Sequence, residues 1–227
     1  IANAEFYNFV ELRARHSDLE FATRSDCEVP LRLYPGAGVD VARELRGMYA
    51  LALHDRRTNS LLLVRDPFGI KPLYYAWHDG ALIFGSELKA ILEYPGMPRN
   101  IDLVALNEYL SFEYVPTPRS IFQGISKLPP GHALQWNPGG DQRITQYWDV
   151  NLARSEGVQS KRLDDSEEEL KAVLRDVVTK EMVSDVPIGV LLSGGIDSSA
   201  VAAIMTEISP GNVKSFSIGF DDPSFDE

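Results

Sequence analysis

Residues 187–203, PIGVLLSGGIDSSAVAA, decide the fold of the C-terminal part of the chain. The apolar run 188–192 is typical of a strand buried in a parallel sheet. Glycine and serine residues follow, and a run of small apolar residues with helical character begins at Ala200. A strand, a glycine-rich turn and a helix in this order predict the start of an α/β parallel-sheet domain.

The turn of this segment is predicted to bind a phosphate group. Backbone N–H groups and the positive end of a helix dipole point at one place there, and they attract an anion without a basic side chain. Glycine lets the main chain turn tightly and approach the anion. The residues expected to bind nucleotide phosphates are Ser193, Gly194, Gly195, Ile196, Asp197 and Ser198. Asp197 is also the predicted Mg²⁺ ligand, since magnesium favours one or two carboxylates beside phosphate oxygens.

The turn does not have the Walker form, because the string G-x-x-x-x-G-K-[ST] is absent from the chain. The competing interpretation is an ordinary turn in which glycine and serine only cap a helix. Six specified positions directly behind an apolar strand favour phosphate binding over capping.

Composition limits the class of protein. The 227 residues are 44% hydrophobic and 24% charged, which is typical of a soluble globular protein. The net charge of −11 argues against nucleic acid as the main partner. No apolar run approaches the roughly 20 residues that span a bilayer, so no membrane partner is expected. The lone Cys27 forms no internal disulfide, which predicts a cytoplasmic location.

The pattern changes along the chain, which predicts two domains. Short strands with tight turns, at 48–54, 61–64, 73–77 and 82–84, predict an antiparallel sheet. Helices are expected at 87–93 and at 103–112, the second capped by Asp102. Residues 1–149 form the first predicted domain, residues 150–165 a polar linker, and residues 166–227 a second domain. Ser166 and Glu169 form a capping box that predicts the first helix of this second domain.

Three further segments carry a family resemblance: LRGMYA (45–50), RDPFGIKPLYY (65–75) and GSELKA (85–90). Together with YVPTP (114–118) and LPPGH (128–132), they resemble the glutaminase domain of glutamine-dependent asparagine synthetases. The loop 193–198 resembles the pyrophosphate loop of N-type ATP pyrophosphatases, which follows the glutaminase domain in that family. The resemblance implies an α+β fold of the N-terminal-nucleophile type, with stacked antiparallel sheets and helices. It implies the start of an α/β parallel-sheet ATP pyrophosphatase domain after it.

The resemblance also implies roles for single residues. Asn3 and the backbone N–H of Ala4 correspond to the oxyanion hole, and Asn3, Ala4, Glu5 and Asp26 to the glutamine-binding residues. Carboxylates such as Glu5 and Asp26 suit the α-ammonium group of glutamine, although helix capping or solvation would equally explain them. The family has glycine where this chain has Ala4, so a positive φ there would add strain of ~1 kcal/mol or more.

Two further roles follow from the same comparison. Leu191 and Ile218 correspond to residues that contact the adenosine of ATP, although both could instead belong to the core. The nucleophile of the family is an N-terminal cysteine, which is absent from this chain, because Ile1 has no thiol and Cys27 is internal. The chain as given is therefore not expected to hydrolyse glutamine. We expect it to be a piece of a longer protein, since both ends fall inside patterned segments.

The implied function is ATP-dependent, glutamine-hydrolysing synthesis of asparagine from aspartate through a β-aspartyl-adenylate, with release of AMP and pyrophosphate. Glutamine, aspartate and ATP are the expected substrates, ATP and Mg²⁺ the expected cofactors, and a homodimer is left open. One alternative is a related amidotransferase that acts on another carboxylate, as in β-lactam-forming or exopolysaccharide-associated enzymes. Another is a degenerate binding module without glutaminase activity. Ammonia- or sulfur-dependent pyrophosphatases share the loop but lack the segment 68–75.

Overall fold

A computed structural model describes residues 1–150 and 163–219 of the chain. It divides into two compact units, Ile1–Asn151 and Leu152–Glu227, each of which is described by itself. The predicted linker lies largely outside the described residues, as does the end of the second predicted domain after residue 219.

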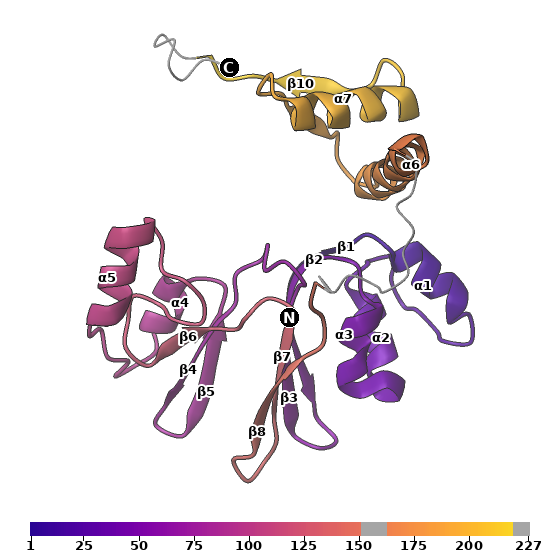
Figure 1. The fold of residues 1–227 in the computed structure, drawn as a ribbon. Helices are drawn as coiled ribbons and strands as arrows, with labels where there is room; N and C mark the ends of the chain where they lie inside the picture. The colour runs from indigo at the N-terminus through magenta and orange to yellow at the C-terminus, as the bar shows by residue number, and fades with distance from the viewer. Residues whose placement is uncertain (151–162, 220–227) are drawn as a thin grey trace. The chain divides into compact units, whose positions relative to one another are not determined.

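Unit 1 is built around a five-stranded antiparallel sheet (Figure 1). Its strands, in spatial order, are β1 (Ala2–Phe6), β2 (Gly47–Asp55), β3 (Ser60–Arg65), β7 (His132–Trp136) and β8 (Gln142–Gln146). β1 is an edge strand that pairs on one side with β2, in a register that sets Ala4 opposite Tyr49. The sheet therefore leaves one side of β1 open.

A second antiparallel sheet has three strands in the order β5 (Ala81–Gly85), β4 (Tyr74–His78) and β6 (Ile125–Lys127). Successive side chains of a strand point to opposite faces of its sheet, so one face of the first sheet can pack against the second sheet. Ala50 and Ala52 of β2 share an apolar cluster with Leu134 of β7 and with Tyr75 and Phe84 of the second sheet. The two sheets are therefore stacked, as the family resemblance implies.

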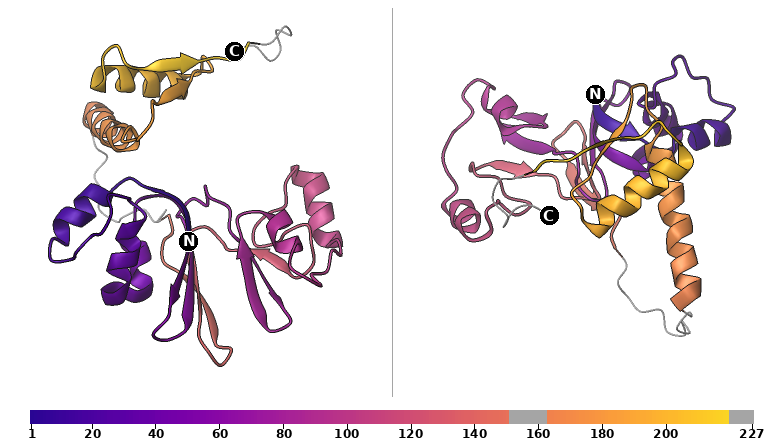
Figure 2. Two further views of the ribbon diagram at one scale, coloured as in Figure 1. Left: turned by 180° about the vertical axis from the view of Figure 1, so that it is seen from behind. Right: turned by 90° about the horizontal axis from the view of Figure 1, so that it is seen from above.

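Helices cover the outer faces of both sheets (Figures 1 and 2). Beside the first sheet lie α1 (Phe9–Arg15), α2 (Glu28–Ala37), a 3₁₀ turn (Gly38–Asp40) and α3 (Val41–Glu44). Leu51 and Leu53, the residues of β2 that alternate with the two alanines, pack into this helical layer. α4 (Leu88–Leu92) packs against the second sheet. The expected α+β architecture is confirmed.

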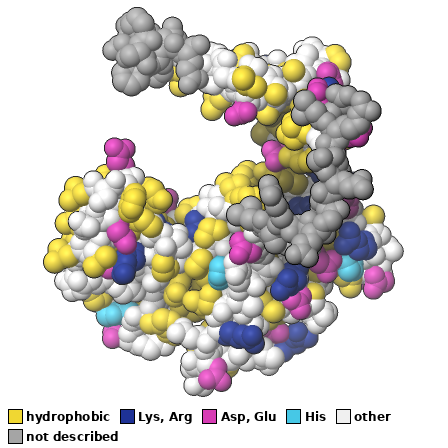
Figure 3. Space-filling model, in the orientation of Figure 1, with side chains coloured by type: hydrophobic (Ala, Val, Ile, Leu, Met, Phe, Trp, Pro, Cys, Tyr) yellow, Lys and Arg dark blue, Asp and Glu magenta, His cyan; other side chains and the backbone are white. Residues whose placement is uncertain are grey.

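The remaining helix of unit 1, α5 (Leu103–Phe112), begins where the sequence predicts. Asp102 caps it by accepting hydrogen bonds from the N–H groups of Val104 and Ala105, at 2.9 and 3.2 Å. Such a cap contributes about 1 kcal/mol. Leu103 and Leu110 are exposed, and Figure 3 shows hydrophobic side chains gathered over this end of unit 1.

The segment 65–71 connects the two sheets through buried charges. Asp66 is fully buried, and its carboxylate accepts hydrogen bonds from the backbone N–H groups of Tyr49, Phe68, Ile70 and Lys71. The guanidinium of Arg65 donates to three backbone carbonyls, including that of Leu128 at 2.8 Å. Backbone partners satisfy both charges, so their burial does not leave an unpaired ion. The motif RDPFGIKPLYY thus organises the core.

Unit 2 contains α6 (Leu163–Glu181), β9 (Gly189–Leu191), α7 (Ile196–Ile208) and β10 (Lys214–Phe216). β9 and β10 pair in parallel, which confirms the predicted change of sheet type. The capping box at Ser166 and Glu169 is wrong as a helix start, because α6 begins at Leu163. Acidic residues such as Asp165 are favourable in a first helical turn, so the helix extends further toward its N-terminus.

Among residues 1–150 and 163–219, no helix combines the length and the apolarity that crossing a bilayer requires.

Candidate functional site

The open edge of β1 presents backbone N–H groups that β2 does not use. Ile1 exchanges two hydrogen bonds of 2.9 Å with Ala52, and Tyr7 donates to Arg46 at 2.9 Å. Hydrogen-bonded and non-hydrogen-bonded pairs alternate in an antiparallel ladder, so even-numbered residues of β1 point their N–H groups away from β2. The N–H of Ala4 therefore lies at the open edge, where a bound ligand can accept a hydrogen bond from it.

The backbone conformation of Ala4 suits this role. Among the described non-glycine residues, positive φ occurs at Asn59, Asp79 and Glu113, and Ala4 is not one of them. The methyl group of Ala4 packs against the helical layer. Alanine in place of glycine thus brings no left-handed strain to this position.

After Ala4, the pairing of β1 with β2 requires a glycine in β2. Gly47 has a φ of +148°, and a Cβ added to it would lie 2.0 Å from the carbonyl oxygen of Glu5. No side chain fits at that distance, so glycine is required where β2 meets Glu5 and Phe6.

The predicted glutamine-binding residues come together at this edge. Asn3 and Glu5 are exposed and lie on the face of β1 opposite to Ala4 and Phe6. Asp26 reaches β1 from the loop before α2, and its Oδ2 accepts a hydrogen bond from the N–H of Phe6 at 2.9 Å. The structure thus brings Asp26 to the strand that carries the other three predicted residues.

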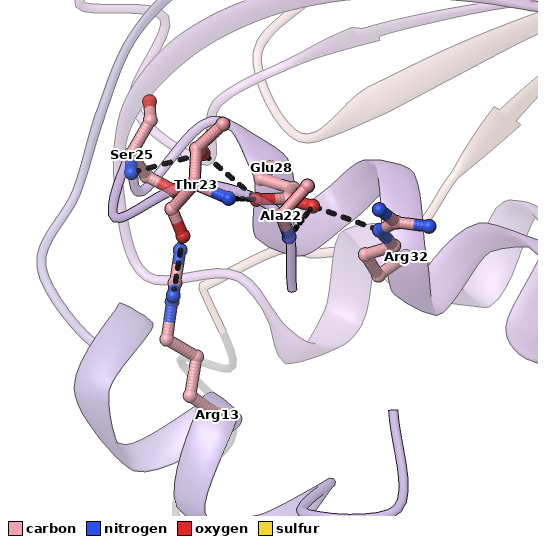
Figure 4. A network of polar contacts seen from close by, with 6 residues as sticks. All are labelled: Arg13, Ala22, Thr23, Ser25, Glu28 and Arg32. Carbon is pink, nitrogen blue, oxygen red and sulfur yellow. Dashed lines mark hydrogen bonds and ion pairs between the residues drawn. The ribbon is translucent and has the colours of Figure 1, made fainter. Parts of the chain in front are cut away.

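Glu28 and Arg13 hold the loop that precedes Asp26, and neither has a counterpart in the sequence prediction. Glu28 is 8% exposed, and its carboxylate accepts hydrogen bonds from the N–H groups of Ala22 and Thr23 (Figure 4). These bonds, together with those from the Thr23 hydroxyl and Arg32, lower the pKa of Glu28 to about 2. Arg13 of α1 holds the same loop. The sequence signal that could have identified Glu28 is a single carboxylate within the apolar run 27–31, CEVPL.

Cys27 and the histidines do not form a second nucleophilic site. Burial raises the pKa of the Cys27 thiol, and the negative charge of Asp26 raises it further, so the thiolate is disfavoured. His54 hydrogen-bonds Asn59 at 3.0 Å, and His132 hydrogen-bonds the carbonyl of Pro130 at 2.7 Å. Both histidines have structural partners.

In unit 2, the predicted phosphate loop lies between the carboxyl end of β9 and the first turn of α7. Gly194 has a φ of +94°, a conformation that favours glycine. Gly195 is the N-cap of α7, so no cap side chain covers the first N–H groups of this 13-residue helix. The hydroxyls of Ser193 and Ser198 lie 3.2 Å apart, and Ser198 donates to the Gly195 carbonyl. The N–H groups of Ser193 and Gly195 donate to Ser198 Oγ and Ser193 Oγ, both at 3.4 Å, so the loop is a compact turn closed by its own serine hydroxyls.

The remaining predicted nucleotide-binding residues surround this turn. Leu191 and Ile218 are 75% and 76% exposed among the described residues. Leu191 is the last residue of β9 and Ile218 follows the end of β10, and ligands in open α/β sheets bind at the carboxyl ends of strands. Asp197 and Ile196 are exposed in the first turn of α7.

The donor set of the loop bears on the predicted metal. In the part of the chain that the structure describes, no group of three or more His, Cys, Asp and Glu side chains could hold a metal ion. Asp197 contributes one carboxylate. Magnesium takes one or two carboxylates and fills its other positions with phosphate oxygens and water, so this loop fits Mg²⁺ together with a nucleotide.

Comparison with known families divides the chain at the same place. Residues 1–148 match the family model of the glutamine amidotransferase domain. Residues 169–227 match the family model of asparagine synthase.

Curated relatives extend over both units. Asparagine synthetase [glutamine-hydrolyzing] 1 of Bacillus subtilis is 38% identical, with coverage of 100% of this chain and 35% of the relative. Putative asparagine synthetase [glutamine-hydrolyzing] 2 of Methanocaldococcus jannaschii is 36% identical, and the match covers 97% of this chain and 43% of the relative. The amidase chry2 of Gibberella zeae is 30% identical, and the match covers 99% of this chain and 35% of the relative. The chain thus spans about a third to two fifths of the length of these relatives.

Proposed function

The chain belongs to the glutamine amidotransferase domain family, and from this premise we propose that the complete protein is a glutamine-hydrolysing asparagine synthetase. Glutamine would supply ammonia, ATP would activate the side-chain carboxylate of aspartate as a β-aspartyl-adenylate, and ammonia would displace AMP. Pyrophosphate would be the second product of the ATP reaction. We assign residues 1–149 to the glutaminase domain and residues from about 166 onward to the ATP pyrophosphatase domain, and we place the protein in the cytoplasm.

The glutaminase role of unit 1 depends on the open edge of β1. The N–H of Ala4 and the side chain of Asn3 would stabilise the oxyanion that forms when glutamine is attacked. Asp26 and Glu5 would bind the α-ammonium group through charge-assisted hydrogen bonds. No N-terminal cysteine is present in this chain, and the proposal places the nucleophile in residues outside it.

The ATP role of unit 2 depends on the turn between β9 and α7. The uncapped N–H groups at the start of α7, with Ser193 and Ser198, would hold the leaving pyrophosphate. Asp197 would hold Mg²⁺, which would neutralise the charge on the phosphates when bound. Leu191 and Ile218 would contact the adenosine at the ends of the strands.

The observation that carries the proposal is the presence of both sites in one chain. The N–H of Ala4 points away from β2 on the same strand edge where Phe6 binds the carboxylate of Asp26, and a separate unit holds a glycine turn at Gly194. Either site alone would fit several enzyme classes, but an ammonia-releasing site and a nucleotide site together suit an amide-forming synthetase.

The test is a product assay on the complete protein with glutamine, ATP and Mg²⁺, with and without aspartate. We expect asparagine, AMP and pyrophosphate in equal amounts, and pyrophosphate only when aspartate is present. Pyrophosphate release that ignores aspartate but follows another carboxylate would assign the protein to a related amidotransferase. The similarity to the amidase chry2 makes this the second candidate.

A variant separates the two proposed sites. Asp197→Ala should lower the ATP reaction by at least 100-fold, because the phosphates lose their metal ligand, and should leave glutaminase activity within twofold. Glu207→Gln, on the same helix and paired with Arg175, is the matched control and should change neither rate. Equal loss of both activities in Asp197→Ala would show that the loop has another role.

A further inference from the structure

The loop formed by residues 22–25 is held by polar contacts from two helices (Figure 4). From α2, Oε1 of Glu28 accepts the N–H of Ala22 at 2.8 Å, and Oε2 accepts the N–H and the hydroxyl of Thr23, both at 2.7 Å. Arg32 donates to Oε1 at 2.8 Å from the next turn of α2. Glu28 thus binds the amide side of the loop.

From α1, Arg13 binds the carbonyl side of the same loop. Its Nη1 donates to the carbonyl of Thr23 at 2.9 Å, and its Nη2 donates to that of Ser25 at 2.7 Å. The guanidinium also lies over the ring of Phe21, 4.6 Å from its centre. Because the guanidinium is planar and donates to two carbonyls at once, it fixes the orientation of the loop backbone as well as its distance from α1.

These contacts end immediately before Asp26. The carboxylate of Asp26 spans from the loop to β1, with Oδ2 on the N–H of Phe6 and Oδ1 on the N–H of Cys27 at 2.8 Å. A shift of the loop backbone would therefore move the carboxylate away from the edge of β1.

The helix α2 does not need Glu28 for its attachment to the core. Val29 and Leu33 bury the apolar face of the helix, and Pro30 is buried beside them. The contacts of Glu28 instead reach backward to the loop.

We propose that Glu28 and Arg13 are positioning residues, which hold the loop 22–25 so that Asp26 presents its carboxylate to the α-ammonium group of an amino-acid substrate. This inference rests on the proposed glutaminase function. It predicts that the two residues affect recognition of the ammonium group rather than the chemistry at the amide.

The experiment compares glutamine with glutaric acid monoamide, which has the same amide but no α-ammonium group, as substrates of the complete protein. In Glu28→Gln and in Arg13→Met, we expect KM for glutamine to rise roughly tenfold or more with kcat within threefold, as charged hydrogen bonds are lost. The rate constant kcat/KM for the monoamide should stay within threefold. The preference for glutamine should therefore fall about tenfold in both variants.

Asp55→Asn is the matched control. Asp55 is another carboxylate whose pKa hydrogen bonds lower to about 2, first those from Arg57, but it lies at the end of β2 away from this loop. The control should lower thermal stability without changing the preference. Hydrogen–deuterium exchange of peptides that cover 19–27 supplies a readout without substrate, and exchange should increase in Glu28→Gln and Arg13→Met alone.

An unchanged preference with faster exchange would overturn the inference, because the loop would then be held for stability only. Unchanged exchange would overturn it as well. If the wild-type protein hydrolyses neither compound, the proposed glutaminase function fails instead, and the positioning role fails with it. If the wild type prefers glutamine and the variants keep that preference, the positioning role alone fails.

Discussion

The carboxylate of Asp26 accepts a hydrogen bond from the backbone N–H of Phe6 at 2.9 Å, across 20 residues of chain. The N–H of Phe6 lies on the open side of β1, so the carboxylate pairs a donor that the sheet leaves unused. A carboxylate has about four acceptor positions. Phe6 and Cys27 each take one, and the Ser25 hydroxyl takes another at 3.4 Å, so Asp26 keeps capacity for one further donor such as an ammonium group.

Asp26→Asn should weaken glutamine binding without disturbing the fold. The amide oxygen still accepts the N–H of Phe6, but the charge that attracts the α-ammonium is lost. A charged hydrogen bond is worth about 1.5–3 kcal/mol, so KM for glutamine should rise roughly 10- to 100-fold. Steady-state kinetics on the complete protein measure the change. Asp18→Asn, at an exposed position after α1, should leave KM unchanged, and an equal rise there would contradict the assignment.

Ala4→Pro tests the oxyanion donor directly. Proline removes the N–H, and an edge strand tolerates proline where the N–H faces away from its neighbour. Loss of one oxyanion donor lowers kcat about 10²–10³-fold, so glutaminase turnover should fall by that factor with little change in the thermal midpoint.

Ala2→Pro is the matched control for this prediction. Ala2 occupies the same kind of non-hydrogen-bonded pair in β1, opposite Leu51. We expect its kcat to stay within threefold of the wild type. Equal losses in both variants would mean that proline disturbs the strand rather than the oxyanion hole.

Gly47→Ala should separate β1 from β2 at the functional edge. The added Cβ would lie 2.0 Å from the Glu5 carbonyl oxygen in a backbone of φ +148°, so the strands must move. Calorimetry should show a large drop in the midpoint of the unit 1 transition. Gly80→Ala, with φ +75° and open space around its Cβ, should cost only about 1 kcal/mol for its left-handed backbone. Similar costs at the two positions would contradict this account of Gly47.

Acidification should reveal the contribution of Glu28 to stability. Hydrogen bonds, first that from the N–H of Ala22, lower its pKa from 4.5 to about 2. A carboxyl with a lowered folded-state pKa stabilises the protein above its unfolded-state pKa, and this stabilisation is lost as the pH falls toward the folded-state pKa. Glu28→Gln should therefore unfold at a lower temperature than wild type at pH 7. This gap, the difference between the two unfolding midpoints, should narrow between pH 4.5 and 2.

Thermal denaturation monitored by circular dichroism between pH 7 and pH 2 measures that gap. Leu31→Ala, at an exposed position of the same helix, should show a gap that does not depend on pH. A constant gap for Glu28→Gln would mean that its charge is not held by the loop.

Local patterns predicted only part of the elements, and β1, α1 to α3 and β6 to β8 were not predicted. Alternating apolar residues predicted β2, β3, β4 and β5 close to their observed bounds, and Asp102 marked the start of α5. The start of α6 was missed, because Ser166 and Glu169 imitate a cap inside a helix that begins at Leu163. Acidic residues extend such a helix without a distinct sequence signal.

The candidate site was predicted in parts. The turn around Gly194 was predicted from local sequence, because a strand, glycines and a helix start act over a few residues. Asp26 and Ala4 were assigned by family resemblance, and their proximity depends on a bond between the loop before α2 and the end of β1. Glu28 and Arg13 carried no motif, since their partners are backbone atoms of Ala22, Thr23 and Ser25.

The sequence by itself determined the antiparallel strands of unit 1, the parallel pair in unit 2 and the glycine turn, because side-chain periodicity and glycine conformation are local properties. Only the tertiary structure decided that the N–H of Ala4 lies on the open side of β1 and that Asp26 reaches that edge. The direction of an N–H depends on which residues of a distant strand form the hydrogen-bonded pairs. That register is fixed by the packing of the whole sheet and by the space that Gly47 leaves for Glu5.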